Sequence, residues 1–137
     1  IYSDEDAGKR EADYNEIRLA EIYYSLAECK FKANDVDGAA KLLNAVRKRN
    51  YPQDTWAEYL YKPEGTVTLT QDELYDEWGR EFLAEGRRRT DLIRWGLYCT
   101  EEWWDKKPDA DSHWDIFPIP RDMMGADHTL KQNPGYN

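Results

Sequence analysis

Residues 70–96 read TQDELYDEWGREFLAEGRRRTDLIRWG, and they predict two consecutive helices. Thr70 can cap the first free amide groups while Glu73 reaches back, which is the capping-box pattern of a helix start. Gly86 stands where the left-handed end of a helix favours glycine. The apolar positions that recur at helical spacing are Leu74, Tyr75, Trp78, Phe82 and Leu83 in the first run, and Leu92, Trp95 and Tyr98 in the second.

Three glutamates at i, i+4 and i+8, Glu77, Glu81 and Glu85, are expected to line one side of the first helix. Two neighbouring carboxylates could act as the acid and base of a glycoside hydrolase, provided that one keeps its proton. The arginines of the same region are Arg80, Arg87, Arg88, Arg89 and Arg94. Because an adjacent guanidinium lowers a carboxylate pKa, we interpret the cluster as a salt-bridge network between helices. The glycosidase stays open as an alternative.

A family-like sequence motif covers residues 77–96. Its positions are Glu77, Arg80, Glu81, Phe82, Glu85, Gly86, Arg89, Asp91, Leu92, Arg94, Trp95 and Gly96. Together they resemble the C-terminal part of SusD/RagB proteins, the nutrient-binding outer-membrane lipoproteins of gut-type Bacteroidetes. The chain departs from the family at Trp78, where arginine is usual. The resemblance implies that the motif residues belong to the scaffold.

Other strings resemble the same family, in the same order along the chain. They are RLAEIYYSLAE at 18–28, AAKLLNAVRKR at 39–49, IFPIP at 116–120 and QNPGY at 132–136. The resemblance therefore covers nearly all of residues 18–136. No single string would be specific, but the ordered set is.

The composition predicts one globular domain over residues 1–137, since 40% of the residues are hydrophobic and 34% are charged. A formal net charge of −9 argues against nucleic acid as a partner, because phosphate binding needs clustered positive charge. The sequence has no signal peptide and no apolar run long enough to span a membrane. If the resemblance holds, the chain is the C-terminal part of a protein whose export signal and lipid-bearing cysteine lie elsewhere.

Two amphipathic helices are expected at residues 14–33 and 38–49, joined by a turn with Asp37 as the cap of the second. Such a pair resembles a tetratricopeptide-type hairpin. The expected fold is all-α, with helix hairpins, long loops, a helical turn near residues 54–60 and an extended C-terminal tail set by Pro118 and Pro120.

The first helix is expected to bury one stripe and leave its charged residues to solvent. The stripe is Leu19, Ile22, Leu26, Cys29 and Ala33, widened by Ala20, Tyr23, Tyr24, Ala27 and Phe31. The solvent-facing residues are Glu16, Glu21, Glu28 and Lys32. Cys29 and Cys99 are interpreted as small buried hydrophobes, with a disulfide between them left open.

Residues 100–115 form an acidic loop rich in tryptophan. Exposed indoles beside carboxylates suit sugar recognition, because the ring stacks on C–H faces while the oxygens bond hydroxyl groups. Trp103, Trp104 and Trp114 are therefore the candidate glycan-binding residues. The alternative is that these rings fold back and cover the helices, since burying one is worth roughly 2–3 kcal/mol.

No metal or cofactor site is predicted. The alternation of Asp109, Asp111, His113 and Asp115 is like the opening of a calcium loop. However, Trp114 and Pro120 occupy the positions where such a loop needs glycine and glutamate. The two histidines, His113 and His128, lack the spacing of a zinc site.

By resemblance, the full protein holds a glycan or another nutrient at the cell surface and caps a SusC-like TonB-dependent transporter. It would touch the membrane only through a lipid anchor, and this segment would serve mainly as scaffold and transporter-facing surface. No catalytic motif is present in the sequence, so the expected function is non-catalytic binding. A generic tetratricopeptide-type adaptor is the alternative.

Overall fold

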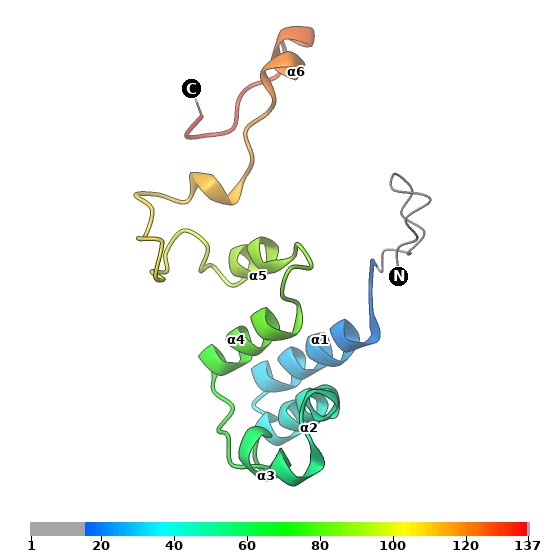
Figure 1. Ribbon diagram of the computed structural model, residues 1–137. Helices are drawn as coiled ribbons and strands as arrows, with labels where there is room; N and C mark the ends of the chain where they lie inside the picture. Colours follow the sequence, from blue (N-terminus) through cyan, green and yellow to red (C-terminus); the bar gives the residue numbers. More distant parts are fainter. Residues whose placement is uncertain (1–15, 137) are drawn as a thin grey trace, which may run out of the picture. The chain divides into compact units, whose positions relative to one another are not determined.

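The computed structural model describes residues 16–136 and confirms the all-α fold (Figure 1). The helices are α1 (Leu19–Lys32), α2 (Val36–Arg47), α3 (Trp56–Tyr59), α4 (Gln71–Glu81), α5 (Arg88–Arg94) and α6 (Arg121–Ala126), with 3-10 turns η2 (Lys48–Asn50), η3 (Gln53–Thr55) and η4 (His113–Asp115). Within this range β-pairing is limited to two isolated bridges, Tyr61–Val67 and Trp103–Lys106. No helix of residues 16–136 is long and apolar enough to cross a bilayer.

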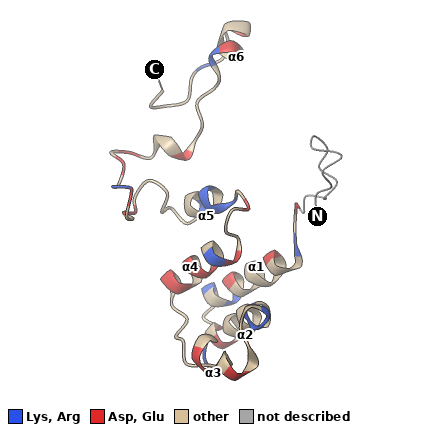
Figure 2. Cartoon of the chain, viewed as in Figure 1, with Lys and Arg blue, Asp and Glu red and all other residues tan. Residues whose placement is uncertain are grey.

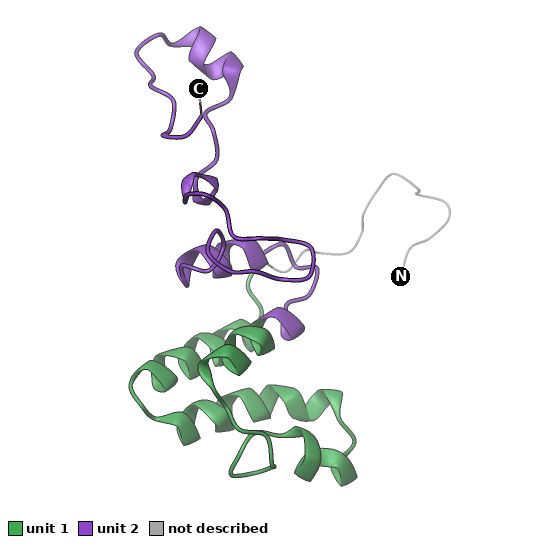
Figure 3. Ribbon diagram, turned by 90° about the vertical axis from the view of Figure 1, so that its left-hand side faces the viewer, with its two compact units in different colours: residues 1–78 green, residues 79–137 purple. Residues whose placement is uncertain are grey.

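The chain divides into two compact units, residues 1–78 and 79–137 (Figure 3). The boundary falls inside α4. The expectation that residues 1–137 fold as one domain stays a prediction.

In the first unit, α1 and α2 pack against each other as the expected hairpin (Figure 1). Asn34 turns the chain with a φ of 63°. Asp35, and not Asp37, is the cap, because its carboxylate accepts a hydrogen bond of 2.9 Å from the backbone N–H of Gly38. Ala39 and Ala40 are fully buried, so the two backbones can approach closely.

The buried face of α1 differs from the predicted one. The buried residues are Ala20, Tyr24, Ala27 and Glu28, whereas Leu19, Ile22, Leu26 and Cys29 are exposed. Tyr24 decides the orientation, because its ring packs edge-on against Trp78 at 5.5 Å and its hydroxyl donates to Glu77. Glu28, predicted to face solvent, lies on this inner face and pairs with Lys32 at 2.7 Å.

Glu77 is the centre of a buried polar network in the first unit. Its carboxylate accepts hydrogen bonds from the Tyr24 hydroxyl, at 2.8 Å, and from the Arg47 guanidinium. Arg47 also donates to the hydroxyl of Tyr61 at 3.1 Å and to the carbonyl of Tyr59 at 2.7 Å. The network therefore ties α1, α2 and α4 to the segment that follows α3.

The segment that follows α3 is also held by hydrogen bonds from Asn44. The Asn44 side chain accepts from the backbone N–H of Tyr61 and donates to its carbonyl, both at 2.8 Å. One planar amide thus satisfies both backbone groups of a buried residue. The short helices η3 and α3 precede this point and confirm the helical turn expected near residues 54–60.

Helix α4 begins as predicted but ends earlier. The Thr70 hydroxyl accepts from the backbone N–H of Glu73 at 3.2 Å, which confirms Thr70 as a cap. The helix stops at Glu81, and Ala84 and Gly86 both take positive φ values in the turn that follows. The prediction that Glu85 continues the helical face of Glu77 and Glu81 is therefore wrong.

In the second unit, α5 carries the arginine cluster (Figure 2). Asp91 is buried on this helix and accepts from Arg87 at 3.0 Å and from Arg94 at 2.9 Å. The Arg94 guanidinium also lies over the Trp95 ring, 4.5 Å from its centre. A carboxylate shared by two guanidinium groups keeps its charge compensated inside the unit.

We expect Glu77→Ala to lower the free energy of unfolding by about 3–5 kcal/mol, because it leaves the buried Arg47 charge without its carboxylate. Urea unfolding followed by circular dichroism measures the change. The matched control is Glu102→Ala, which removes an exposed partner of Lys107 and should change stability by less than about 1 kcal/mol. Equal losses in the two variants would show that the buried network is not central.

Candidate binding site in the C-terminal segment

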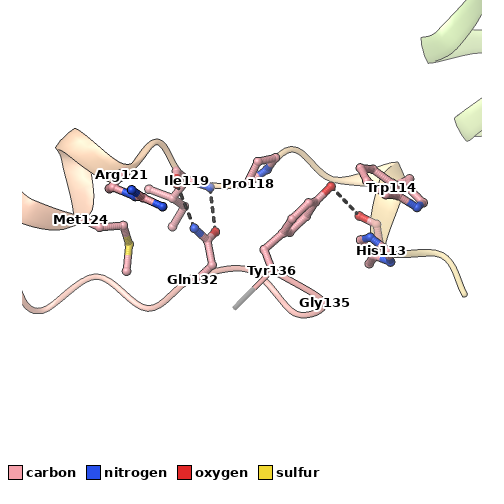
Figure 4. A pocket seen from close by; sticks show the side chains of 9 residues that line it. All are labelled: His113, Trp114, Pro118, Ile119, Arg121, Met124, Gln132, Gly135 and Tyr136. Carbon is pink, nitrogen blue, oxygen red and sulfur yellow. Dashed lines mark hydrogen bonds between the residues drawn. The ribbon is translucent and has the colours of Figure 1, made fainter.

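Side chains of residues 132–136 form hydrogen bonds with the backbone of an extended segment, residues 116–120. Pro118 and Pro120 lack backbone N–H groups, so the segment around Ile119 cannot pair as an ordinary strand. Instead, Gln132 accepts from the N–H of Ile119 at 2.7 Å and donates to its carbonyl at 2.9 Å (Figure 4). Asn133 donates to the carbonyl of Phe117 at 2.8 Å. The two family strings at 116–120 and 132–136 thus bind each other.

Tyr136 completes this attachment. Its hydroxyl donates to the carbonyl of Ile116 at 2.8 Å and lies 3.3 Å from that of His113 (Figure 4). The preceding Gly135 has a φ of 87°, and a side chain there would overlap the side chain of His113. Glycine is therefore required at this turn both by conformation and by space.

Arg89 connects α5 with the same segment. It donates to the carbonyl of Trp114 at 2.6 Å, and its guanidinium lies 3.9 Å from the centre of the Phe117 ring and 5.0 Å from that of Tyr98. Arg89 therefore holds the start of the extended tail. Like Asp91 and Arg94, Arg89 is thus a motif residue with a structural role in the second unit.

A cavity of about 530 Å³ lies between the extended segment and the C-terminal residues (Figure 4). Its lining residues are His113, Trp114, Pro118, Ile119, Arg121, Met124, Gln132, Gly135 and Tyr136. The Trp114 ring meets Tyr136 edge-on at 5.9 Å and lies 4.4 Å from His113, while 49% of its surface stays exposed. The cavity therefore has an aromatic wall that solvent can reach.

The acidic residues beside this wall form a turn. Asp111 accepts from the backbone N–H of His113 at 2.9 Å and also contacts its ring nitrogen. These two hydrogen bonds, the backbone one first, hold the pKa of Asp111 below its ordinary value. Asp115 accepts from the thiol of Cys99.

Residues 16–136 hold no group of three or more His, Cys, Asp or Glu side chains placed to bind a metal ion.

Trp103 and Trp104 lie on a tight turn of the same unit. The backbones of Trp103 and Lys106 exchange two hydrogen bonds of 3.0 Å, which leaves Trp104 and Asp105 at the tip. Trp104 is 95% exposed. Trp103 is half-buried, with the ammonium group of Lys106 lying 4.9 Å from its ring centre. The turn therefore presents one indole fully to solvent.

The three candidate tryptophans thus belong to two different surfaces. The ring contacts of Trp114 are with His113 and Tyr136, and not with the turn at 103–106. Sequence reasoning missed Arg121, Gln132 and Tyr136 as lining residues. The QNPGY string was the available signal, but as a sequence it indicates only a turn.

Comparison with known proteins identifies the class. This is an all-α chain whose motif residues anchor an extended tail, and the SusD family matches residues 3–113. The starch-binding protein SusD of Bacteroides thetaiotaomicron is 37% identical over 131 residues, which cover 87% of this chain and 21% of that protein. The SusD-like protein P25 of Formosa agariphila is 36% identical over 81 residues, which cover 58% of this chain and 15% of that protein.

The chain therefore belongs to the SusD family, as its motifs predicted. It spans about a fifth or less of the length of these two relatives.

We expect Gly135→Ala to loosen the C-terminal segment, because the new methyl group would overlap His113 and the backbone is left-handed there. The cost should be about 1–3 kcal/mol. Hydrogen exchange of residues 113–136 measures it as faster exchange. Gly125→Ala is the matched control: it lies in α6 with open space around it, so exchange should be unchanged or slower. Slow exchange in both variants would contradict the packing described.

Proposed function

We propose that this chain is part of a non-catalytic carbohydrate-binding component of a nutrient-uptake system. The similarity to a starch-binding protein supports carbohydrate as the ligand class. The whole protein would lie on the outer face of the outer membrane, attached by a lipid anchor, and would cap a SusC-like TonB-dependent transporter. This segment would act mainly as scaffold, with its helices supporting the loops that face the ligand.

The observation that carries the proposal is the exposure of Trp104. Tryptophan is highly buried on average in folded proteins, whereas Trp104 is 95% exposed. The two hydrogen bonds between Trp103 and Lys106 hold the turn, so the indole is offered on a defined backbone. Glu101 and Asp105 are its close neighbours in the sequence, and their carboxylates would accept from sugar hydroxyl groups. An indole with adjacent carboxylates is the combination that stacks on a pyranose ring and bonds its rim.

A catalytic role for the glutamates has little support. Glu77 is buried against Arg47 and Tyr24, so it cannot reach a substrate. Glu85 lies beyond the end of α4, so the three glutamates do not form a single face. A pair of carboxylates that share one substrate is what a glycosidase requires. Binding without hydrolysis is therefore the proposal.

We expect Trp104→Ala to weaken binding to soluble starch or another glycan about tenfold, because roughly 1–2 kcal/mol of ring burial is lost. Affinity electrophoresis on gels containing the glycan gives the measurement. Leu83→Ala is the control, since it removes another strongly exposed apolar side chain that lies outside the turn. Retention of full affinity by Trp104→Ala and by the Trp103→Ala/Trp104→Ala double variant would remove this turn as the sugar site.

A second candidate function is attachment of another helix, and the exposed face of α1 favours it. The outer stripe consists of Leu19, Ile22, Leu26 and Cys29, which step by three and four residues. This is the spacing of a helix-packing seam. We propose that a further amphipathic helix of a longer SusD-family polypeptide covers the outer stripe, since this chain matches only 21% and 15% of the length of the two relatives.

The relative reactivity of the two cysteine thiols measures whether the outer stripe is exposed. Cys29 is exposed, whereas burial, followed by the hydrogen bond to Asp115, raises the pKa of the Cys99 thiol. At pH about 8 iodoacetamide should therefore alkylate Cys29 at least about tenfold faster than Cys99. Mass spectrometry of the wild type and of Cys29→Ser separates the two rates. Protection of Cys29 in a longer polypeptide that contains this chain would support the interface, and unchanged reactivity there would contradict it.

A further inference from the structure

We propose that the cavity beside Tyr136 binds an acidic sugar residue, with Arg121 holding its carboxylate or sulfate group. This inference rests on the proposed carbohydrate function and assigns a ligand class to a second surface of the same unit. The juxtaposition that suggests it is an aromatic wall, formed by Trp114 and Tyr136, in the same cavity as a guanidinium group (Figure 4).

The cavity is large enough for a sugar ring, and two of its lining side chains are held in place. Its volume of about 530 Å³ lies within the range of ordinary small-ligand sites, about 300–1,000 Å³. The Tyr136 hydroxyl is bonded to the backbone of Ile116, and the Gln132 amide is bonded on both sides to Ile119. These two side chains cannot rotate freely, so a ligand does not have to order them on binding.

The aromatic wall suits the apolar face of a sugar ring. Trp114 keeps about half of its surface in solvent, and Pro118 adds a flat aliphatic surface beside Tyr136. The hydroxyl of Tyr136 points toward the backbone carbonyls, which leaves its ring as the lining surface (Figure 4). C–H groups of a pyranose can pack on such surfaces as apolar side chains do.

Arg121 supplies the charge selectivity. Other arginines of the chain are committed: Arg47 to Glu77, Arg87 and Arg94 to Asp91, and Arg89 to backbone carbonyls. The side chain of Arg121 forms no ion pair or hydrogen bond with any residue in the described range 16–136, and it lines the cavity. A planar guanidinium without a partner binds carboxylate or sulfate in a two-point geometry.

Neither Asp111 nor Asp122 forms an ion pair with Arg121. The charge of Asp111 is engaged by the backbone and ring of His113. Asp122 follows Arg121 in the chain but makes no ion pair with it. Since the chain carries a net charge of −9, any preference for an anionic sugar must come from a local site and not from general attraction.

The test is isothermal titration of this chain with three oligosaccharides: an oligogalacturonate, a sulfated galactan fragment and maltohexaose. We expect binding of at least one of the two anionic ligands, weakened about tenfold or more by Arg121→Gln, which is the effect of losing a hydrogen bond to a charged group. Trp114→Ala should weaken the same ligand. The anionic ligand that binds identifies carboxylate or sulfate as the recognised group.

Lys131→Gln is the matched control, because it removes the same charge from an exposed residue that does not line the cavity. An equal loss of affinity in Arg121→Gln and Lys131→Gln would overturn the inference. So would unchanged affinity in Arg121→Gln, or no binding of either anionic ligand. Binding of maltohexaose alone, lost in Trp104→Ala, would leave the proposed function standing while this inference fails.

Discussion

The first unit depends on one buried carboxylate. Glu77 is desolvated, so it is stable only where Tyr24 and Arg47 donate to it, and this fixes the faces that α1, α2 and α4 turn toward one another. Arg47 then extends the constraint to the segment after α3 through Tyr59 and Tyr61. Apolar packing alone would let three short helices slide or rotate, whereas these directional hydrogen bonds to Glu77 favour one arrangement of the helices.

Much of the fold followed from the sequence. Periodicity and capping residues predicted the hairpin, the start of α4 at Thr70 and the all-α class, because these features depend on neighbours within a few residues. The sequence did not predict which face of α1 is buried. Its apolar residues extend around most of the helix, so the pattern gives the breadth of the face but not the side that is covered. A tyrosine hydroxyl that finds Glu77, 53 residues away, made the choice.

The site was less predictable than the fold, for a related reason. Trp104 and Trp114 could be proposed as sugar-binding residues because their side-chain chemistry is visible in the sequence. The wall around Tyr136 could not, since it forms only when Gln132, Asn133 and Tyr136 bond to backbone groups 13–23 residues earlier. Bonds of this kind carry no periodicity. The prediction that Glu85 lies on the face of α4 was wrong for a different reason. The helix ends at Glu81, and Ala84 takes a left-handed conformation before Glu85 is reached.

Two amide side chains, Asn44 and Gln132, each bind both backbone groups of one residue, Tyr61 and Ile119 respectively. Only an amide has a donor and an acceptor in one plane at this spacing. Aspartate and glutamate have the same shape, but in place of the donor they would present a second oxygen to a carbonyl. Spontaneous deamidation of either residue would therefore turn an attachment into a repulsion without changing the volume of the side chain. The attachment of Tyr61 and of Ile119 therefore depends on the amide group itself and not on the size of the side chain.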